Sequence, residues 1–167
     1  MKTIIEHIVD SLNEQNEIVT ATILQKSGSA PREAGAKMVI RKDGSIEGTI
    51  GGGTLEAMAM QLAPEIFKTK KCSIEDIELT DDDARAAGMV CGGEVSVLLE
   101  YLDALDIHQL NTYHKAKELK ATETDFVMIT KVSDASKRIT GKHKWICTED
   151  DLFGEDDKEI QSIAQEL

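Results

Sequence analysis

The sequence predicts an α+β fold, a mixed or antiparallel sheet with flanking helices, followed by a smaller second α/β portion. Three observations support this prediction. Short runs of β-branched residues alternate with stretches whose apolar residues recur at helical spacing. An Asp43-Gly44 pair stands between two strand-like runs, as in a β-hairpin. Hydrophobic residues fill 41% of the 167 positions and aromatic residues only 4%, so aliphatic side chains must build the core.

The first part of the chain shows these patterns in turn. Ile4, Ile8 and Leu12 share one helical face, and a glycine-rich stretch later passes into a second helix. Pro64 should end or kink that helix near Ala63, because proline lacks an N–H donor and clashes with the preceding turn. In order, the expected elements are a helix over 3–14, a strand over 17–25, a hairpin of 38–41 and 45–49, and a helix from residue 54 onward.

The second part of the chain continues with similar elements. Helix, strand, hairpin and helix is the order of residues 3–68 and again of the region after residue 103, which suggests a degenerate internal duplication. We therefore expect two domains, a glycine-rich one over 1–102 and a smaller α/β region over 103–167 that is a degenerate repeat or a docking part. The expected elements are a strand over 73–79, a short helix over 80–88, a strand over 94–101, a helix from 107, a strand over 126–132, a strand pair over 138–147 around Gly141, and a helix over 158–167.

Charge and cysteine content exclude several classes of protein. The formal net charge is −12, so a polyanionic nucleic acid would be repelled. The three cysteines, Cys72, Cys91 and Cys147, form no CxxC pair, which argues against a disulfide scaffold or zinc ribbon and fits a reducing compartment. No signal peptide and no apolar run of membrane-spanning length is present. We therefore expect a cytoplasmic protein that contacts no membrane.

The central motif of the chain is the stretch GTIGGGTLE at residues 48–56. Its glycines stand where a strand-like run ends and a helix begins, so the backbone can take positive φ and approach a ligand closely. The helix N-terminus then offers unpaired N–H groups to an anion. The alternative is a tight turn that binds nothing. The candidate binding residues here are Thr49, Gly51, Gly52, Gly53, Thr54 and Glu56.

Two other glycine-rich segments accompany this motif. The loop over 26–37 contains Ser29, Arg32 and Lys37, which supply a hydroxyl, a guanidinium fork and an ammonium for a phosphate or carboxylate. The segment over 88–93 ends in Gly92 and Gly93. Each segment ends a predicted element, so pairing of the strands would bring all three to one side of a small sheet.

Cys91 is the most suggestive single residue, because the two glycines after it leave its backbone unhindered. It would serve as a nucleophile, as a metal or sulfur ligand, or as a small buried hydrophobic residue. A small hydrolase or transferase that uses Cys91 on a phosphorylated or nucleotide ligand is therefore one alternative. No cation follows closely enough for a phosphatase cradle, and no histidine lies within the motifs. These absences favour a binding protein without catalysis.

Together, five linked motifs resemble the N-terminal domain of the XdhC/CoxI family over roughly residues 10–102. The motifs are GSAPR at 28–32, GAKM at 35–38, Asp43-Gly44, GTIGGGTLE at 48–56 and GMVCGG at 88–93. Residues 103–167 are similar to the middle region of the family. The resemblance implies an accessory protein, or chaperone, of molybdenum hydroxylases such as xanthine dehydrogenase. Such a protein binds and protects the molybdenum cofactor, assists its sulfuration and passes it to the apo-enzyme.

The resemblance and the residues lead to one hypothesis for the site. The Gly51–Gly53 turn and its helix would hold the phosphate of molybdopterin or of its dinucleotide form, helped by Arg32 and Lys37. Cys91 would lie near the molybdenum or its labile sulfur, with Glu56 and Glu100 in support. The expected partners are the apo-enzyme, a cysteine desulfurase and a second copy of the chain. Larger family members continue into a Rossmann-type domain, whereas this chain contains no GxGxxG. It is therefore a naturally short member, a chain whose partner is a separate Rossmann-domain subunit, or a fragment.

Overall fold

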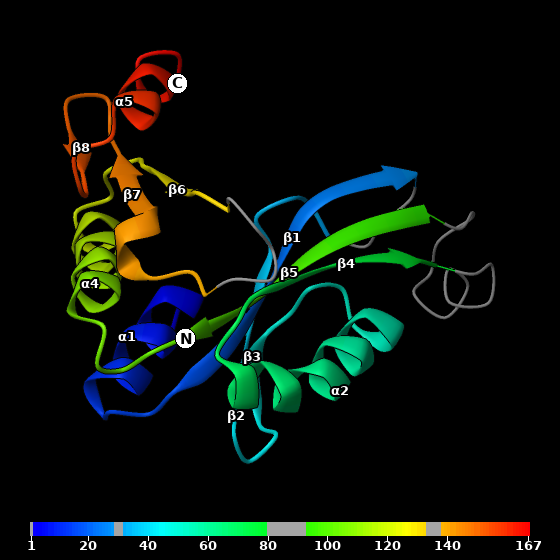
Figure 1. Ribbon diagram of the computed structural model, residues 1–167. Coiled ribbons are helices and arrows are strands. Elements are labelled where there is room, and N and C mark those ends of the chain that lie inside the picture. Colours follow the sequence, from blue (N-terminus) through cyan, green and yellow to red (C-terminus); the bar gives the residue numbers. More distant parts are fainter. Residues whose placement is uncertain (1, 29–31, 80–92, 133–137) are drawn as a thin grey trace.

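The computed structural model describes residues 2–28, 32–79, 93–132 and 138–167. Within these ranges the chain forms two antiparallel sheets with helices packed against them, which confirms the predicted α+β class (Figure 1). The larger sheet has the strand order β3-β2-β1-β5-β4 and the smaller one β6-β7-β8. The strands are β1 (Ile18–Gly28), β2 (Lys37–Arg41), β3 (Ile46–Gly48), β4 (Ser73–Glu78), β5 (Gly93–Leu102), β6 (Val127–Thr130), β7 (Lys144–Cys147) and β8 (Leu152–Phe153). The helices are α1 (Ile4–Asn13), α2 (Gly53–Thr69), α4 (Ile107–Ala121) and α5 (Lys158–Ala164), with a 3-10 turn η1 (Gly141–His143).

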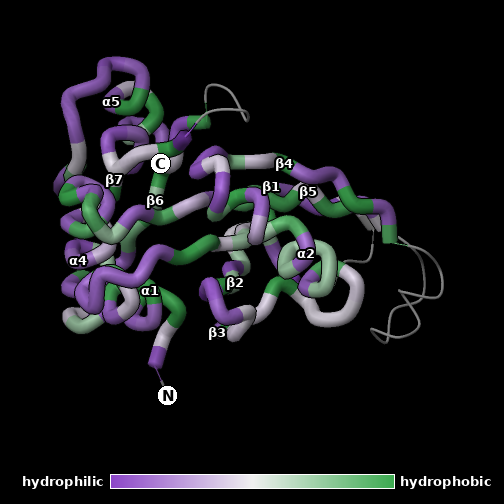
Figure 2. The backbone as a smooth tube through the Cα atoms, turned by 60° about the horizontal axis from the view of Figure 1, so that its bottom comes forward, coloured by the Kyte–Doolittle hydropathy of each residue, from purple (hydrophilic) through white to green (hydrophobic). Residues whose placement is uncertain are grey.

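Helices cover the two faces of the larger sheet. Successive residues of a strand point to opposite faces, so Met38 and Ile40 of β2 join the core under α2, whereas Val39 joins the core formed with α1 and α4. Figures 1 and 2 show α2 beside one face of the sheet. Helices α1 and α4 lie next to each other, near the end of the sheet at which β1 begins. No helix in the described part of the chain is long and apolar enough to cross a membrane.

Helix α2 does not end at Ala63, so the expected effect of Pro64 as a helix end is wrong. Pro64 is exposed, and the residues on either side of it along the inner face, Ala63 and Ile66, are buried in the core. The apolar contacts of the last turn outweigh the single backbone hydrogen bond that proline cannot donate. The helix instead runs to Thr69, and its C-cap residue Lys70 has a left-handed backbone and donates its N–H to the Ile66 carbonyl over 2.8 Å.

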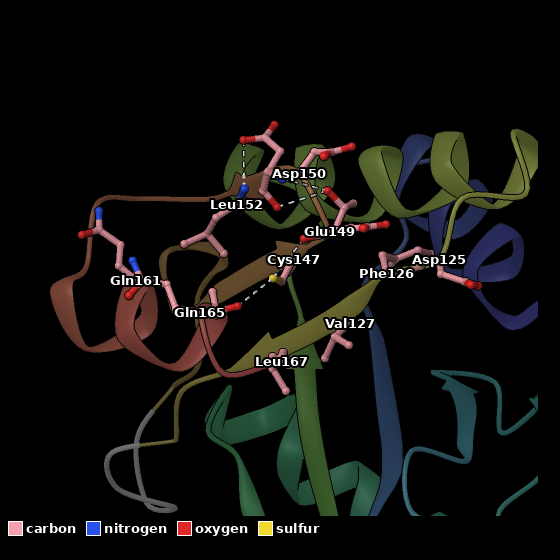
Figure 3. A pocket seen from close by; sticks show the side chains of 13 residues that line it. Asp125, Phe126, Val127, Cys147, Glu149, Asp150, Leu152, Gln161, Gln165 and Leu167 are labelled. Carbon is pink, nitrogen blue, oxygen red and sulfur yellow. Dashed lines mark hydrogen bonds between the residues drawn. The ribbon is translucent and has the colours of Figure 1, made fainter.

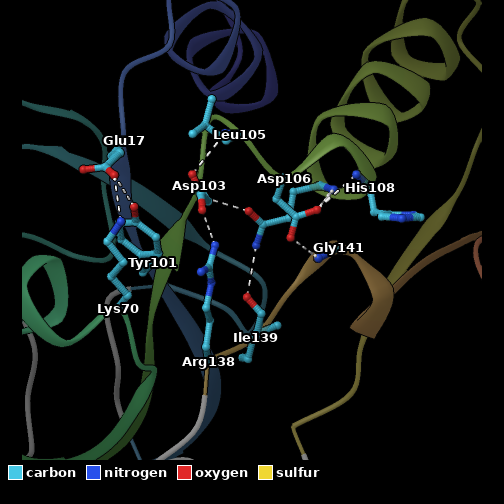
Figure 4. Close-up of polar contacts among 11 residues, drawn as sticks. Glu17, Lys70, Tyr101, Asp103, Leu105, Asp106, His108, Arg138, Ile139 and Gly141 are labelled. Carbon is cyan, nitrogen blue, oxygen red and sulfur yellow. Dashed lines mark hydrogen bonds and ion pairs between the residues drawn. The ribbon is translucent and has the colours of Figure 1, made fainter.

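The stretch before β7 is also different from the prediction, because residues 138–140 form no strand. A polar network around the start of α4 holds them instead (Figure 4). Arg138 pairs with Asp103, the Gln109 amide donates to the Ile139 carbonyl over 3.2 Å, and the Gly141 N–H donates to the Asp106 carboxylate over 2.9 Å. These contacts come from distant residues, which explains why a local pattern did not reveal them. The short helix expected over 80–88 lies outside the described residues.

The two parts of the chain share one order of elements within the described ranges. The order α1-β1-β2-β3-α2 is followed, after β4 and β5, by α4-β6-β7-β8-α5 with η1 before β7, and the strands β1–β3 and β6–β8 each form an antiparallel meander. This order agrees with the suggested duplication. The duplication itself and the domain boundary after residue 102 stay predictions.

Candidate functional site

Glycine-rich segments meet at one end of the larger sheet. Gly28 at the end of β1 is the register partner of Gly93 at the start of β5. The first turn of α2 lies below the same end of the sheet (Figure 1), and its Leu55 shares a core with Ile23 and Val95. We call Gly28, Gly93 and the turn over 49–53 the glycine end. The predicted site residues Ser29, Cys91 and Gly92 lie outside the described residues.

A bulge in β1 separates this end from the neighbouring hairpin. The register of β1 against β5 shifts between Ile23 and Gln25, and the pairing of β1 with β2 stops at Thr22. The N–H of Gly35 donates to the Ile23 carbonyl over 2.8 Å, which closes the loop that carries Arg32. The bulge therefore lets the last residues of β1 follow β5 alone to the glycine end.

Glu56 holds the glycine turn in shape. Its Oε1 accepts hydrogen bonds from the Thr49 hydroxyl over 2.5 Å, from the Gly52 N–H over 2.9 Å and from the Ile50 N–H over 3.3 Å. The Gly51 N–H donates to the Thr49 hydroxyl oxygen over 3.1 Å. A carboxylate is favoured here because the first turn of α2 carries the positive end of the helix dipole. Sequence reasoning gave Glu56 a supporting role, and the structure makes it the internal acceptor of the turn.

The other side of the turn is open. Gly52 and Gly53 have φ values of 77° and 52°, and a Cβ added to either would have no atom within 4 Å. The Gly53 N–H has no acceptor among the described residues, whereas those of Ile50, Gly51 and Gly52 are bonded within the turn. Thr54 follows as the second residue of α2 and is half-buried. The Gly53 N–H can therefore donate a hydrogen bond to a ligand without any change in the hydrogen bonds within the turn.

The two cations expected at this turn are placed differently. Arg32 is exposed and forms no ion pair with a described residue, whereas the adjacent Glu33 pairs with Lys26 over 2.6 Å. Lys37 is the first residue of β2 and donates to the hydroxyl of Thr22, its cross-strand partner. Alternation along β2 puts Lys37 on the face opposite α2. Lys37 is thus not brought to the glycine turn, because the sheet lies between them.

Lys37 instead borders a buried polar cluster between the two sheets. The Lys144 Nζ lies 2.9 Å from both oxygens of the Glu100 carboxylate, and each of these side chains is only 1% exposed. Lys144 also donates to the Thr130 hydroxyl over 3.2 Å. Burial opposes the charge of Lys144, but Glu100 and then Tyr113 outweigh it and raise its pKa. The ion pair between Glu100 and Lys144 therefore links β5 to β7. Lys144 was not predicted from the sequence, because only the folded sheets bring it to Glu100.

The charge of Lys37 is only partly balanced in this cluster. Burial, followed by repulsion from Lys144, lowers the pKa of Lys37 to about 8, although Glu100 acts in the opposite direction. The unfolded chain therefore binds more protons than the folded one between pH 8 and the ordinary lysine value of 10.5. The cost of burying the charged amine is fully present below pH 8 and disappears as the pH rises through this window.

We expect Lys37→Met to raise the free energy of unfolding at pH 7, because it removes this cost and keeps a side chain of similar length. The gain should shrink steadily from about pH 8 to pH 10. Urea unfolding of both proteins at four pH values measures it. The control Lys120→Met, at an exposed position in the last turn of α4, should give a difference that does not change with pH. Two results would contradict the placement of Lys37. One is a Lys37→Met chain that is less stable than the unchanged chain at pH 7. The other is a difference in free energy of unfolding between these two chains that does not change with pH.

The fold and the glycine end define a two-sheet α+β protein with a glycine turn at a helix N-terminus. Residues 11–78 match the sequence model of the XdhC and CoxI family. The matched region includes the glycine turn and Arg32, and it ends before Cys91 and Gly93.

Individual proteins are also similar to this chain. The chain is 26% identical over 157 residues to a probable xanthine dehydrogenase subunit of Bacillus subtilis (strain 168), covering 92% of this chain and 44% of that protein. It is 38% identical over 66 residues to the molybdenum cofactor insertion chaperone PaoD of Escherichia coli (strain K12), covering 40% of this chain and 21% of PaoD. The uncharacterized protein YqeB of the same organism is 37% identical over 89 residues, covering 53% of this chain and 16% of YqeB.

A solved structure extends the likeness beyond the family match. The crystal structure of a xanthine dehydrogenase from Bacillus halodurans superimposes with a TM-score of 0.67 at 28% sequence identity. The superposition covers 92% of this chain and 45% of that one. The chain therefore spans less than half the length of each of these relatives.

Proposed function

We propose that this chain takes part in the maturation of a molybdenum hydroxylase, binding the molybdenum cofactor as cargo and inserting it into the apo-enzyme. The observation that carries the proposal is that the family match contains the open glycine turn. The names of two relatives support it, since one is a cofactor insertion chaperone and the other belongs to a probable xanthine dehydrogenase. A carrier must also release its cargo, and an open turn suits that requirement better than a closed cavity.

The described residues fit one end of such a cargo. The cofactor supplies a phosphate or pyrophosphate, a polar pterin and a molybdenum atom with oxo and sulfido ligands. The Gly53 N–H at the start of α2 and the guanidinium of Arg32, which pairs with no described carboxylate, would hold the phosphate. Glu56 would keep the turn in the binding shape. Lys37 is left out of this cradle, because its side chain lies on the other face of the sheet.

Further parts of the proposal concern the metal end and the partners. Cys91 precedes Gly93 by two positions in the sequence, and we propose that its thiol serves the molybdenum or its labile sulfur. Assistance in sulfuration would need a sulfur donor, for which we propose a cysteine desulfurase as partner. A homodimer and a separate Rossmann-domain subunit complete the proposed assembly.

The proposal is tested by anaerobic equilibrium binding of isolated molybdenum cofactor to the chain. We expect saturable binding, and Arg32→Ala should weaken it about tenfold, because one charge-assisted hydrogen bond contributes about 1.5 kcal/mol. Cys91→Ala should weaken it further if the thiol is at the metal end. Lys120→Ala removes an equal charge from an exposed position on α4 and should bind as the unchanged chain does.

Two outcomes would overturn the proposal. One is the absence of saturable binding to a chain that is folded by circular dichroism. The other is an equal loss of cofactor affinity in Arg32→Ala and Lys120→Ala, because this result would mean that only general electrostatic attraction holds the cofactor.

A further inference from the structure

A pocket of about 840 Å³ lies on the smaller sheet, in the part of the molecule away from the glycine end (Figures 1 and 3). Residues from the start of β6, the end of β7, the loop before β8, and α5 line it. Figure 3 shows Cys147 between two groups of side chains, with Val127 and Leu167 on one side and Glu149 and Asp150 on the other. The pocket thus has an apolar part and an acidic part.

The apolar part leaves hydrophobic surface in contact with water. Phe126, Val127, Leu152 and Leu167 line the pocket, and Val127 and Leu167 are 46% and 69% exposed. Val127 also begins β6, which is an edge strand because within the described residues it is hydrogen-bonded to β7 alone. Exposed apolar side chains gathered at a hollow beside an edge strand are typical of a protein interaction site.

The acidic part carries charge that the described part of the chain does not neutralise. Asp125, Glu149, Asp150 and Asp151 line the pocket with no Lys, Arg or His among the described lining residues, and none of the four pairs with a described cation. Carboxylates of the following turn are satisfied, by contrast, because Glu155 pairs with Lys142, and Asp157 and Glu159 pair with Lys131.

A metal ion does not explain this arrangement. No three His, Cys, Asp or Glu side chains in the described part of the chain are placed to hold one. Four carboxylates that no described cation neutralises line the same pocket as apolar side chains, and this arrangement is complementary to a group that carries cationic charge next to an apolar part.

We propose that this pocket docks a segment of a partner protein, which inserts one aliphatic or aromatic side chain and places flanking Lys or Arg residues against the four carboxylates. The apolar floor gives the affinity, and the carboxylates select the sign of charge and speed the encounter. The proposal is independent of the cofactor function, because the pocket lies in the second part of the chain and the glycine turn in the first.

The test uses fluorescence anisotropy of labelled hexapeptides added to the full chain. The first peptide has a Leu-Phe pair between two lysines on each side. The second replaces Leu-Phe by Ser-Ser, and the third replaces the lysines by glutamates. We expect saturable binding of the first peptide alone, weakened by added salt. Equal binding of the first and second peptides, or tighter binding of spermine than of the first peptide, would overturn the docking of an apolar side chain.

A pair of charge-matched variants locates the site. Glu149→Gln/Asp150→Asn/Asp151→Asn should weaken binding of the first peptide about tenfold. The control Glu14→Gln/Glu65→Gln/Glu78→Gln neutralises three exposed carboxylates elsewhere and should bind as the unchanged chain does. Equal losses in the two triple variants would overturn the assignment to this pocket. Both variants should keep full cofactor binding, so that failure of docking and failure of the cofactor function are seen separately.

Discussion

Lys144→Met is expected to lower the free energy of unfolding by about 3–5 kcal/mol, as measured by urea unfolding at pH 7. The substitution leaves the Glu100 carboxylate buried at 1% exposure without the ammonium that lies 2.9 Å from it. An uncompensated buried charge must then be protonated or reached by water, and both cost free energy. Since small domains are stable by only about 5–15 kcal/mol, the variant should be near its unfolding threshold.

The double variant Lys144→Met/Glu100→Leu separates a charge effect from a packing effect. Replacing both members of a buried pair by apolar residues of similar volume is often neutral, so we expect it to recover most of the loss. If Lys144→Met alone is too unstable to purify, the double variant, which leaves neither charge buried alone, is still expected to fold. A double variant as unstable as Lys144→Met, or a loss below about 1 kcal/mol in Lys144→Met, would contradict the buried pair.

Gly141→Ala is expected to lower the free energy of unfolding by about 3 kcal/mol or more. A Cβ at Gly141 would stand 2.0 Å from the backbone nitrogen of Gln109 and 2.3 Å from the carbonyl carbon of His108. Both are backbone atoms of the first turn of α4, so no side-chain rotation relieves the clash. The 3-10 turn would have to move away from α4 and break the Gly141–Asp106 hydrogen bond (Figure 4).

Gly44→Ala is the matched control, measured by thermal and urea unfolding beside Gly141→Ala. Gly44 has a φ of 82° and open space around an added Cβ, so its cost is conformational, at about 1–2 kcal/mol. The cost at Gly141 is steric and should be clearly larger. A Gly141→Ala chain no less stable than Gly44→Ala would contradict the close contact between η1 and α4.

Patterns of neighbouring residues were enough to predict much of the fold. The stripe of Ile4, Ile8 and Leu12 became α1, and Asp43-Gly44 became the turn between β2 and β3. Periodicity and turn chemistry act over a few residues, which is why they can be recognised before the chain folds. The order of the glycine-rich motifs likewise led to the family that the comparisons support.

Sheet register decided which predicted site residues meet. Alternation along β2 separates Lys37 from Met38, but the sequence did not reveal which face α2 would cover. The sequence also left open whether Gly28 would pair with Gly93, because these residues are far apart in the chain. Lys37 therefore looked equivalent to Arg32 as a phosphate-binding cation until the sheet placed Lys37 on the face opposite α2.

The sequence by itself thus determined the α+β class, the main helices and strands of the first part, the acidic charge and the glycine-rich turn. Only the tertiary structure decided that Glu56 holds that turn, that Lys144 meets Glu100, and that α2 continues through Pro64. It also decided that four acidic residues and several apolar side chains line one pocket. The physical reason is that local propensity acts between neighbours in the chain, whereas pairing, burial and charge depend on residues that only the folded sheets bring together.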